Sequence, residues 1–418
     1  MPCNCFIVPP HLLRAIASST HNNESIRKSA QQCVDFHEKL ILARSKSFAA
    51  AASSNRARGP ASFRISPFVP QVLLRHLSKA EDVDDAARSL AAKDLDHAQQ
   101  LMSSKSDATG TSKDDQKAGK PKKAPKDTPH RSIYDAQHAE DQSSLPGELK
   151  RSEGEAKNKD KVVNEAYDNV GAVLEFYKDK FNWNSIDNKG SDVISSVHFG
   201  ESYENAFWDP EHLQMVFGDG GEFLKNFTKC VDVIGHELTH AITEHTSPLD
   251  YQRQPGALNE HVSDVFGIMI KQKMENETSD KADWLIGEGC LVPDVKGLAL
   301  RSMKAPGTAY DDPRFGKDPQ VDNMSGYEKS WEDNGGVHIY SGIPNKAFYL
   351  AATAFGGYSW EKAGQIWWKA MTSGNIPARC SFQQFADVTV ECAEEEFGED
   401  AAKIVRKAWN DVGVRRKI

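Results

Sequence analysis

Apolar residues recur at helical spacing along much of the chain. Between residues 160 and 181 they lie three or four positions apart, which predicts a helix. Residues 192–218 instead alternate and are rich in aromatic side chains, which predicts strands and a turn. After Cys230 the helical spacing returns and predicts helices over 231–245, 257–276, 336–355, 359–371, 381–395 and 399–410. A strand-rich part followed by a helix-rich part predicts an α+β protein with two lobes.

The first hundred residues contain two similar segments. Residues 8–16 (VPPHLLRAI) match residues 69–77 (VPQVLLRHL), and each leads into a helix-compatible stretch, ending near His37 and near His97. Two short helical units joined by residues 46–62 would account for the match. Chance similarity between two amphipathic helices is the alternative.

Residues 103–129 differ from everything around them. They contain seven lysines and four aspartates among small and polar residues, with no hydrophobic anchor larger than alanine. Such a segment cannot bury enough apolar surface to offset its ordering entropy, so we predict a disordered linker.

Composition narrows the class of protein without identifying it. Apolar residues make up 39% and charged residues 27%, which is typical of soluble globular proteins, and the net charge of -9 gives no reason to expect nucleic acid as a partner. No apolar run reaches about 18 residues, so we expect no transmembrane helix and no membrane partner. The first residues lack the pattern of a signal peptide, which leaves a cytoplasmic location or secretion by a non-classical route.

The seven cysteines are scattered and odd in number, so reduced thiols are the default expectation. A pair such as Cys380 and Cys392 could still bond if the protein is exported.

The strongest chemical signal is His236-Glu237-Leu238-Thr239-His240. Side chains four residues apart share one face of a helix, so both imidazoles can reach a single ion. Glu237 can address a water bound to that ion, as in the HExxH motif of metalloproteases. Two surface histidines on an ordinary helix are the alternative, which the apolar flanks of this segment weaken.

Catalytic zinc takes three protein ligands and leaves one position open. We predict Glu260, in the segment 259–264 (NEHVSD), as the third ligand. His261 is the rival, but it points to another side of the helix. Asp264 lies one turn beyond Glu260 and suits an acceptor that orients a ligand histidine. Pro248 and the QPG at 254–256 are expected to break the chain between the two helices.

The segment 236–264 (HELTHAITEHTSPLDYQRQPGALNEHVSD) resembles the core of the thermolysin-like peptidases. Further matches are 205–208 (NAFW), 217–220 (FGDG), 300–303 (LRSM) and 333–338 (DNGGVH). The resemblance covers roughly residues 130–418. Residues 5–13 (CFIVPPHLL) are similar to the short propeptide of the protealysin-like branch, whereas the second copy and the linker depart from that pattern.

The resemblance implies a thermolysin-like α+β fold preceded by a small helical propeptide region. The segments it suggests are a propeptide at 1–45, a second propeptide-like repeat at 46–102, the linker at 103–129, a β-rich lobe with the zinc helix at 130–246, and a helical lobe at 247–418.

Roles follow for the residues around the expected zinc ion. Glu237 is the natural general base for a zinc-activated water. His338 can donate to the developing oxyanion, and Asp333 can hold its imidazole in the donor state. The resemblance places Tyr251 beside His338.

The resemblance also implies how an extended substrate is held. Asn205 and the backbone of Ala206 are expected to bind its main chain, and Arg301 is expected to bind a carbonyl after the cut. A preference for a bulky apolar residue just after the cut is expected from the positions that line the family's main pocket, although these could be plain core residues: Val233, Ile286 and Leu300.

Calcium and the N-terminal thiols are open questions. Asp232, Asp283 and Glu288 match calcium-ligand positions of the family, yet Lys271 replaces a shared carboxylate. We therefore expect one calcium ion at most, or an ion-pair cluster instead. A thiolate from Cys3 or Cys5 could cap the zinc ion of a precursor, unless the two are merely exposed thiols.

We predict a zinc endopeptidase made as a latent precursor, acting on peptides or proteins and kept silent by its own N-terminal propeptide. One alternative is a catalytically silent zinc scaffold, which would have no chemical need for Glu237, Tyr251 and His338 together. Another makes the repeated front module a partner-binding domain that regulates the peptidase.

Overall fold

The structure is a computed structural model that describes residues 6–53, 129–140, 142–209, 212–330 and 333–415. The described residues up to 40 and from 129 onward belong to one compact unit. Cys3, Cys5, the second repeat beyond residue 53 and nearly all of the predicted linker lie outside the described residues, so these predictions stay untested.

A five-stranded sheet forms the first lobe. Its strands are β1 (Arg131–Asp135), β2 (Glu148–Ser152), β3 (Val193–Val197), β4 (Ala206–Asp209) and β5 (Gln214–Phe217), in the order β2-β1-β3-β5-β4. The inner pairs β1–β3 and β3–β5 are parallel, and each edge strand is antiparallel to its neighbour. The strands predicted within 192–218 are confirmed. We missed β1 and β2, whose mostly polar residues give no clear alternation.

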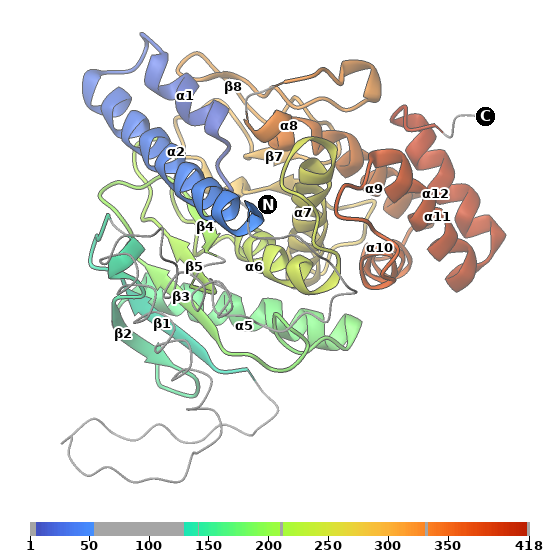
Figure 1. Cartoon of the computed structure of the whole chain (residues 1–418), viewed down its shortest axis with the longest axis horizontal. Helices are drawn as coiled ribbons and strands as arrows, with labels where there is room; N and C mark the ends of the chain where they lie inside the picture. Colours follow the sequence, from blue (N-terminus) through green and yellow to red (C-terminus); the bar gives the residue numbers. More distant parts are fainter. Residues whose placement is uncertain (1–5, 54–128, 141, 210–211, 331–332, 416–418) are drawn as a thin grey trace, which may run out of the picture. The chain divides into compact units, whose positions relative to one another are not determined.

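Helix α5 (Lys161–Phe181) connects the sheet to the second lobe. Its N-terminus is capped by Asp160, whose side chain accepts from the amide of Val162, and it ends at Asn182 in the left-handed conformation. It contacts the central strands and also α6 (Val231–Thr246), as Figure 1 shows. A buried contact of 2.6 Å joins the hydroxyls of Tyr177 and Thr239. This contact fixes α6 against α5.

Helix α6 packs along α7 (Arg253–Glu275), and two glycines set how closely they approach. A Cβ atom on Gly267 would lie 2.6 Å from the carbonyl oxygen of Asp232, and one on Gly235 would lie 3.1 Å from the Cα of Gly267. Any side chain at these positions would force the helices apart. This close crossing lets side chains from both helices meet at one point.

One predicted boundary was wrong. We expected the QPG at 254–256 to break the chain before a helix beginning at residue 257, but α7 already begins at Arg253. Pro255 lies in the first turn of α7, where its missing N–H has no helical partner to lose. The break is made by residues 247–252 alone, including Pro248.

The rest of the second lobe is mainly helical. Its helices are α8 (Asp333–Tyr340), α9 (Gly342–Phe355), α10 (Lys362–Thr372), α11 (Phe382–Phe397) and α12 (Glu399–Asp411). Two small hairpins, β6 (Leu285–Ile286) with β7 (Arg301–Ser302) and β8 (Asp311–Asp312) with β9 (Gly316–Lys317), lie between α7 and α8. The single helix predicted over 336–355 is in fact two, α8 and α9. The α+β fold with two lobes is confirmed.

Two helices, α1 (Pro10–Ser18) and α2 (Glu24–Ser53), form the described part of the front segment. Leu12, Leu13 and Ile16 of α1 are buried. We expected the second helix to end near His37, but it continues to Ser53 through a run of four alanines, the best helix formers. The predicted boundary at residue 45 therefore falls inside α2.

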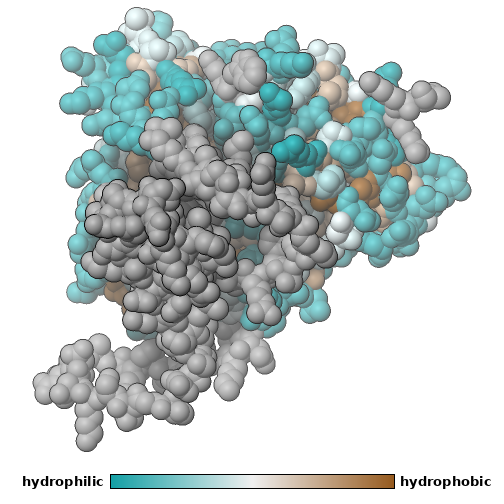
Figure 2. Space-filling view, viewed as in Figure 1, coloured by the Kyte–Doolittle hydropathy of each residue, from teal (hydrophilic) through white to brown (hydrophobic). Residues whose placement is uncertain are grey.

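In the ranges that the structure describes, no helix is both long and apolar enough to cross a membrane. The face in Figure 2 is largely hydrophilic wherever described residues are visible.

His198, which directly follows the central strand β3, makes the stability of the fold depend on pH. His198 lies between Asp219 (2.7 Å) and Asp160 (2.8 Å), the N-cap of α5. The hydrogen bond to Asp219 raises the pKa of His198 to about 9, assisted by Asp160 and opposed by burial. Because the folded pKa is above the unfolded value of about 6.5, this stabilisation is complete below pH 6.5 and lost as pH rises through 9.

We expect His198→Asn to lower the free energy of unfolding at pH 6 by about 1 kcal/mol, as for partly exposed ion pairs. Asparagine suits the positive φ of 56° at this position, so backbone strain should not contribute. The difference from the unsubstituted chain should disappear above pH 9 in denaturant titrations. A difference independent of pH would show that the charge of His198 is not responsible.

Candidate active site

His236 and His240 of α6 and Glu260 of α7 meet in the interior. All three are fully buried, and their ligand atoms lie within 4.8 Å of one another. The Nε2 atoms of the two histidines are 3.0 Å apart, and the carboxylate of Glu260 lies 3.5 Å from His236 and 3.7 Å from His240. The structure thus brings together the three residues predicted as ligands.

The hydrogen bonds of His236 and His240 leave both rings able to bind a cation. Nδ1 of His236 lies 2.8 Å from a carboxylate oxygen of Asp264, and Nδ1 of His240 lies 2.7 Å from the amide oxygen of Asn259. Both acceptors favour a proton on Nδ1, which leaves an Nε2 lone pair on each ring facing the same point. Oε2 of Glu260 accepts no hydrogen bond from any described residue. Two imidazoles and a carboxylate arranged in this way match a catalytic zinc site.

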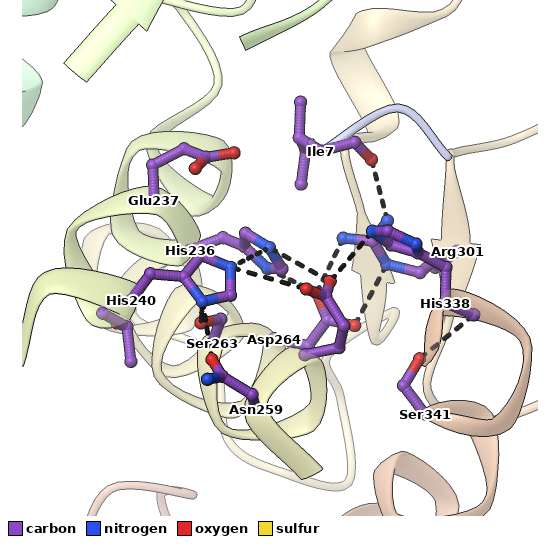
Figure 3. A network of polar contacts seen from close by, with 12 residues as sticks. Ile7, His236, Glu237, His240, Asn259, Ser263, Asp264, Arg301, His338 and Ser341 are labelled. Carbon is purple, nitrogen blue, oxygen red and sulfur yellow. Dashed lines mark hydrogen bonds and ion pairs between the residues drawn. The ribbon is translucent and has the colours of Figure 1, made fainter. Parts of the chain in front are cut away.

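Asp264 joins the metal cluster to Arg301. The guanidinium donates to both oxygens of Asp264, at 2.8 and 3.0 Å (Figure 3). Asn345 also donates to Oδ2 of Asp264, at 2.9 Å. Burial favours the neutral acid, but Arg301 and His236 hold the pKa of Asp264 well below its usual range. Asp264 is therefore an anion that fixes the ring of His236 and compensates a buried guanidinium.

His261, the rival ligand, faces elsewhere. Its Nδ1 lies 2.8 Å from the amide oxygen of Asn345, and its Nε2 accepts from the indole N–H of Trp367 at 2.8 Å. Burial lowers the pKa of His261 to about 4, so it is neutral. Both ring nitrogens are used within the core, as the helical geometry predicted.

Glu237 lies on α6 between the two histidines. It is fully buried, and its Oε2 accepts from the backbone amide of Trp208 in β4 at 2.8 Å. This bond aims the carboxylate across the space between the sheet and the metal cluster, as Figure 3 shows. The position suits a group that exchanges a proton beside the metal.

His338, Asp333 and Tyr251 form a second set on the opposite side. Nδ1 of His338 lies 2.7 Å from Asp333, and its Nε2 lies 3.3 Å from Glu260 and 3.5 Å from the hydroxyl of Tyr251. Tyr251 also donates a short hydrogen bond to Glu260. Burial opposes a charge on His338, but Asp333 and Glu260 outweigh it and raise its pKa to about 9. At neutral pH the ring is an imidazolium with an N–H directed into the site.

The front segment occupies the space above the metal cluster. The amide of Ile7 donates to the carbonyl of Ala206 at 3.2 Å, and the carbonyl of Ile7 accepts from Arg301 at 2.9 Å. The side-chain amide of Asn205 both accepts from the N–H of Val8 (2.9 Å) and donates to its carbonyl (3.0 Å). The three residues expected to hold substrate thus bind the chain's own residues 7–8.

An aromatic cluster holds this segment down. The ring of Phe6 stacks on His37 of α2, with centroids 3.7 Å apart, and Phe36 contacts Phe199 and Phe207 of the first lobe. His37 also lies 2.9 Å from the hydroxyl of Tyr203. Helix α2 therefore covers the segment it follows.

The apolar positions predicted to form the main pocket are all buried. The amide of Leu300 donates to the carbonyl of Ile286 at 3.0 Å, so these two lie on neighbouring chain segments. Val233 belongs to the first turn of α6 and is fully buried.

Lys271 lies among the oxygens considered for calcium. Its ammonium is 2.9 Å from Glu288, 3.1 Å from Asp283 and 3.3 Å from the carbonyl of Leu285. Asp232 accepts from the amide of Gly287 at 2.6 Å. Burial disfavours the charged form, but Glu288 and Asp232 raise the pKa of Lys271 above its usual value. The ion-pair cluster is the arrangement that the structure contains.

The described cysteines are free thiols. The pair brought together is not Cys380 and Cys392 but Cys230 and Cys290, with sulfurs 3.5 Å apart. Sequence separation carried no information about this, because the contact depends on how the segment after α7 returns to the start of α6.

Comparisons with known proteins agree with this geometry. Residues 92–244 match the family model for the thermolysin metallopeptidase catalytic domain, and residues 247–414 match the one for its alpha-helical domain. An extracellular metalloprotease of Pectobacterium carotovorum is 49% identical, over 70% of this chain and 83% of the relative. Protease PrtS of a Photorhabdus species is 43% identical, over 84% of this chain and 92% of the relative.

Among solved structures, the precursor of protealysin, a metalloproteinase from Serratia proteamaculans, aligns with a TM-score of 0.66 and 46% identity. The alignment covers 83% of this chain and 98% of the other. The fold, the metal cluster and these matches together define a metallopeptidase. The chain belongs to the thermolysin family, whose members bind zinc, and within that family it is protealysin-like.

Sequence inspection missed several partners of the site. Asn259 and Ser263, four residues apart, both contact Nδ1 of His240, at 2.7 and 3.1 Å. Their helical spacing was available in the same segment that yielded Glu260 and Asp264. The partnership of Trp208 with Glu237, and that of His37 with Phe6, had no sequence signal because each joins distant segments.

Proposed function

We propose that the chain is a zinc endopeptidase made as a latent precursor, with His236, His240 and Glu260 as the zinc ligands. The observation that carries the proposal is the convergence of two Nε2 lone pairs and one carboxylate beside a buried glutamate, within a metallopeptidase fold. Zinc bound there would supply Lewis-acid polarisation of the scissile carbonyl and a lowered pKa of the attacking water.

Glu237 acts as the general base. It takes the proton from the water that attacks the peptide carbonyl and passes it to the leaving amine. The hydrogen bond from the amide of Trp208 fixes one carboxylate oxygen of Glu237 in place. A buried carboxylate held in this way needs no reorientation between the two proton transfers.

His338 and Tyr251 stabilise the charge that develops on the carbonyl oxygen. Both groups direct a donor toward the side of the site opposite Glu237, and Asp333 keeps the imidazole charged. Donors fixed in a water-excluded site are worth more than the same donors in water.

Substrate is held by the groups that bind residues 7–8. Asn205 binds the N–H and the carbonyl of Val8, the carbonyl of Ala206 accepts from the N–H of Ile7, and Arg301 donates to the carbonyl of Ile7. The residue bound by Ala206 and Arg301 is Ile7, and its apolar side chain supports a preference for a bulky apolar residue after the cut. We assign the pocket for that residue to Val233, Ile286 and Leu300. Since Lys271 supplies a positive charge among the acidic groups, we infer that no calcium ion is needed there.

The front segment acts as the inhibitor. Residues 7–8 use the same hydrogen-bonding groups that a substrate needs, so the two cannot bind together. Removal of the segment is then the activating step. Because close relatives carry the name extracellular metalloprotease, we infer secretion rather than a cytoplasmic location for this chain.

Weakening the packing of the front segment against the rest of the protein should release activity without proteolysis. In the full-length chain, we expect Phe6→Ala to raise hydrolysis of a short fluorogenic peptide about tenfold or more, because truncating a buried phenylalanine removes several kcal/mol of packing. The matched control is Glu38→Ala, which removes only the exposed ion pair with Arg14. Equal basal rates in Phe6→Ala and the unsubstituted chain would contradict autoinhibition.

Metal removal tests the proposed function directly. After an incubation that allows the precursor to process itself, the chain should cleave an unfolded protein, lose that activity in a zinc chelator, and regain it when zinc is restored. A chain that binds zinc stoichiometrically yet cleaves nothing, even without its front segment, would instead be the silent scaffold.

A further inference from the structure

Two cysteines lie side by side next to the metal-binding helix, outside the catalytic machinery. Cys230 is the N-cap residue of α6, and Cys290 ends the short 3-10 helix Glu288–Cys290. Their sulfurs are 3.5 Å apart, although the residues are 60 positions apart in the chain. Cys290 is fully buried, whereas Cys230 is partly exposed.

The backbone around the two cysteines holds them in place. The amide of Lys225 donates to the carbonyl of Cys290 at 2.9 Å, and the side chain of Asn226 donates to the carbonyl of Gly289 at 3.2 Å. A Cβ atom at Gly289 would lie 3.1 Å from the sulfur of Cys230, so this glycine leaves room for it. A disulfide needs the sulfurs at about 2.05 Å, so the 3.5 Å between them must shorten by about 1.5 Å.

We propose that Cys230 and Cys290 form a disulfide when the protein meets a disulfide oxidant such as oxidised glutathione. The partly exposed sulfur of Cys230, as thiolate, attacks one sulfur of the oxidant and releases one glutathione thiolate. Cys290 then gives its proton to solvent and attacks the sulfur of Cys230, which expels the second glutathione. The two electrons lost by the cysteine pair reduce the oxidant.

The order of these steps follows from the surroundings of the two thiols. The hydrogen bond from Cys290 to Cys230, together with burial, raises the pKa of Cys290 well above its usual value. Cys290 is thus a protected thiol that no bulky oxidant reaches directly. It is placed to resolve a mixed disulfide on its neighbour.

The consequence concerns the metal site. The loop that this bond closes, residues 230–290, contains all three ligands, His236, His240 and Glu260, together with Glu237 and Tyr251. Closing a long loop removes conformations mainly from the unfolded chain. The bond would therefore stabilise the ligand-bearing helices of an exported enzyme while leaving the reduced protein able to fold inside the cell.

The test uses the full-length chain in reduced and oxidised glutathione buffers, followed by denaturation, alkylation and mass spectrometry. In the oxidising buffer we expect two fewer alkylated cysteines, a mass lower by two hydrogen atoms before alkylation, and a cross-linked peptide containing Cys230 and Cys290. The Tm should rise by about 5–10 °C on oxidation.

Cys230→Ser should abolish both the cross-link and the rise in Tm, whereas Cys380→Ser, at another buried cysteine, should keep both. Full alkylation of both cysteines in the oxidising buffer would overturn the proposal, and so would stable glutathionylation of Cys230 alone. These results are read from the unsubstituted chain, so they hold even if a variant folds poorly. They are also independent of peptidase activity.

Discussion

Replacing Glu237 by glutamine is expected to lower kcat/KM for peptide hydrolysis by roughly 10²–10⁴-fold, the range that a positioned general base contributes. Glutamine has nearly the same size and can still accept the hydrogen bond from Trp208, so the helix and the neighbouring ligands should be undisturbed. What it cannot do is accept a proton from water. Steady-state kinetics on a short peptide, after removal of the front segment, measure the effect.

Zinc content and Tm of the Glu237→Gln variant should match those of the unsubstituted chain. A matched control is Glu165→Gln on α5, which removes the helical ion pair with Lys161, can still accept from the hydroxyl of Thr228, and should leave kcat/KM unchanged. If Glu237→Gln retained activity within a few-fold of the unsubstituted enzyme, Glu237 would not be the base.

The second large effect is expected at Asp264. Asp264→Asn removes the charge that compensates buried Arg301 and weakens the acceptor that orients His236. Breaking a buried ion pair costs about 3–5 kcal/mol in the free energy of unfolding, and losing the partner of a ligand histidine weakens metal affinity by roughly 10–100-fold. Denaturant titration and competition with a zinc chelator measure the two quantities.

Asp294→Asn is the control for this substitution. Asp294 also pairs with an arginine, Arg314, at 2.7 Å, but its side chain is 70% exposed. Its loss should cost less than about 1 kcal/mol and leave zinc affinity unchanged. Similar losses of stability in the two variants would show that Asp264 has no special electrostatic role.

The spacing of apolar residues predicted the long helices but not strands β1 and β2 of the sheet. Helix α5 was predicted to within one residue at its start, because its buried face is continuous. Strands β1 and β2 were missed, because their largely polar sequences carry no clear alternation and they are stabilised by pairing with neighbouring strands. The division of 336–355 into α8 and α9 was missed because it falls at Ser341 alone, whose dihedral angles (φ −60°, ψ −22°) are themselves helical and leave the apolar pattern uninterrupted.

The sequence by itself predicted the three residues that the structure brings together as a candidate metal site, and the glutamate between the two histidines. Helical geometry sets the relative positions of His236, Glu237 and His240 on α6. The same geometry sets those of Glu260 and Asp264 on α7. Only the tertiary structure decided what surrounds them. Residues 7–8 are hydrogen-bonded to Asn205, Ala206 and Arg301, and Cys230 contacts Cys290. These contacts join distant segments, so they depend on how the helices and strands pack, which local periodicity does not encode.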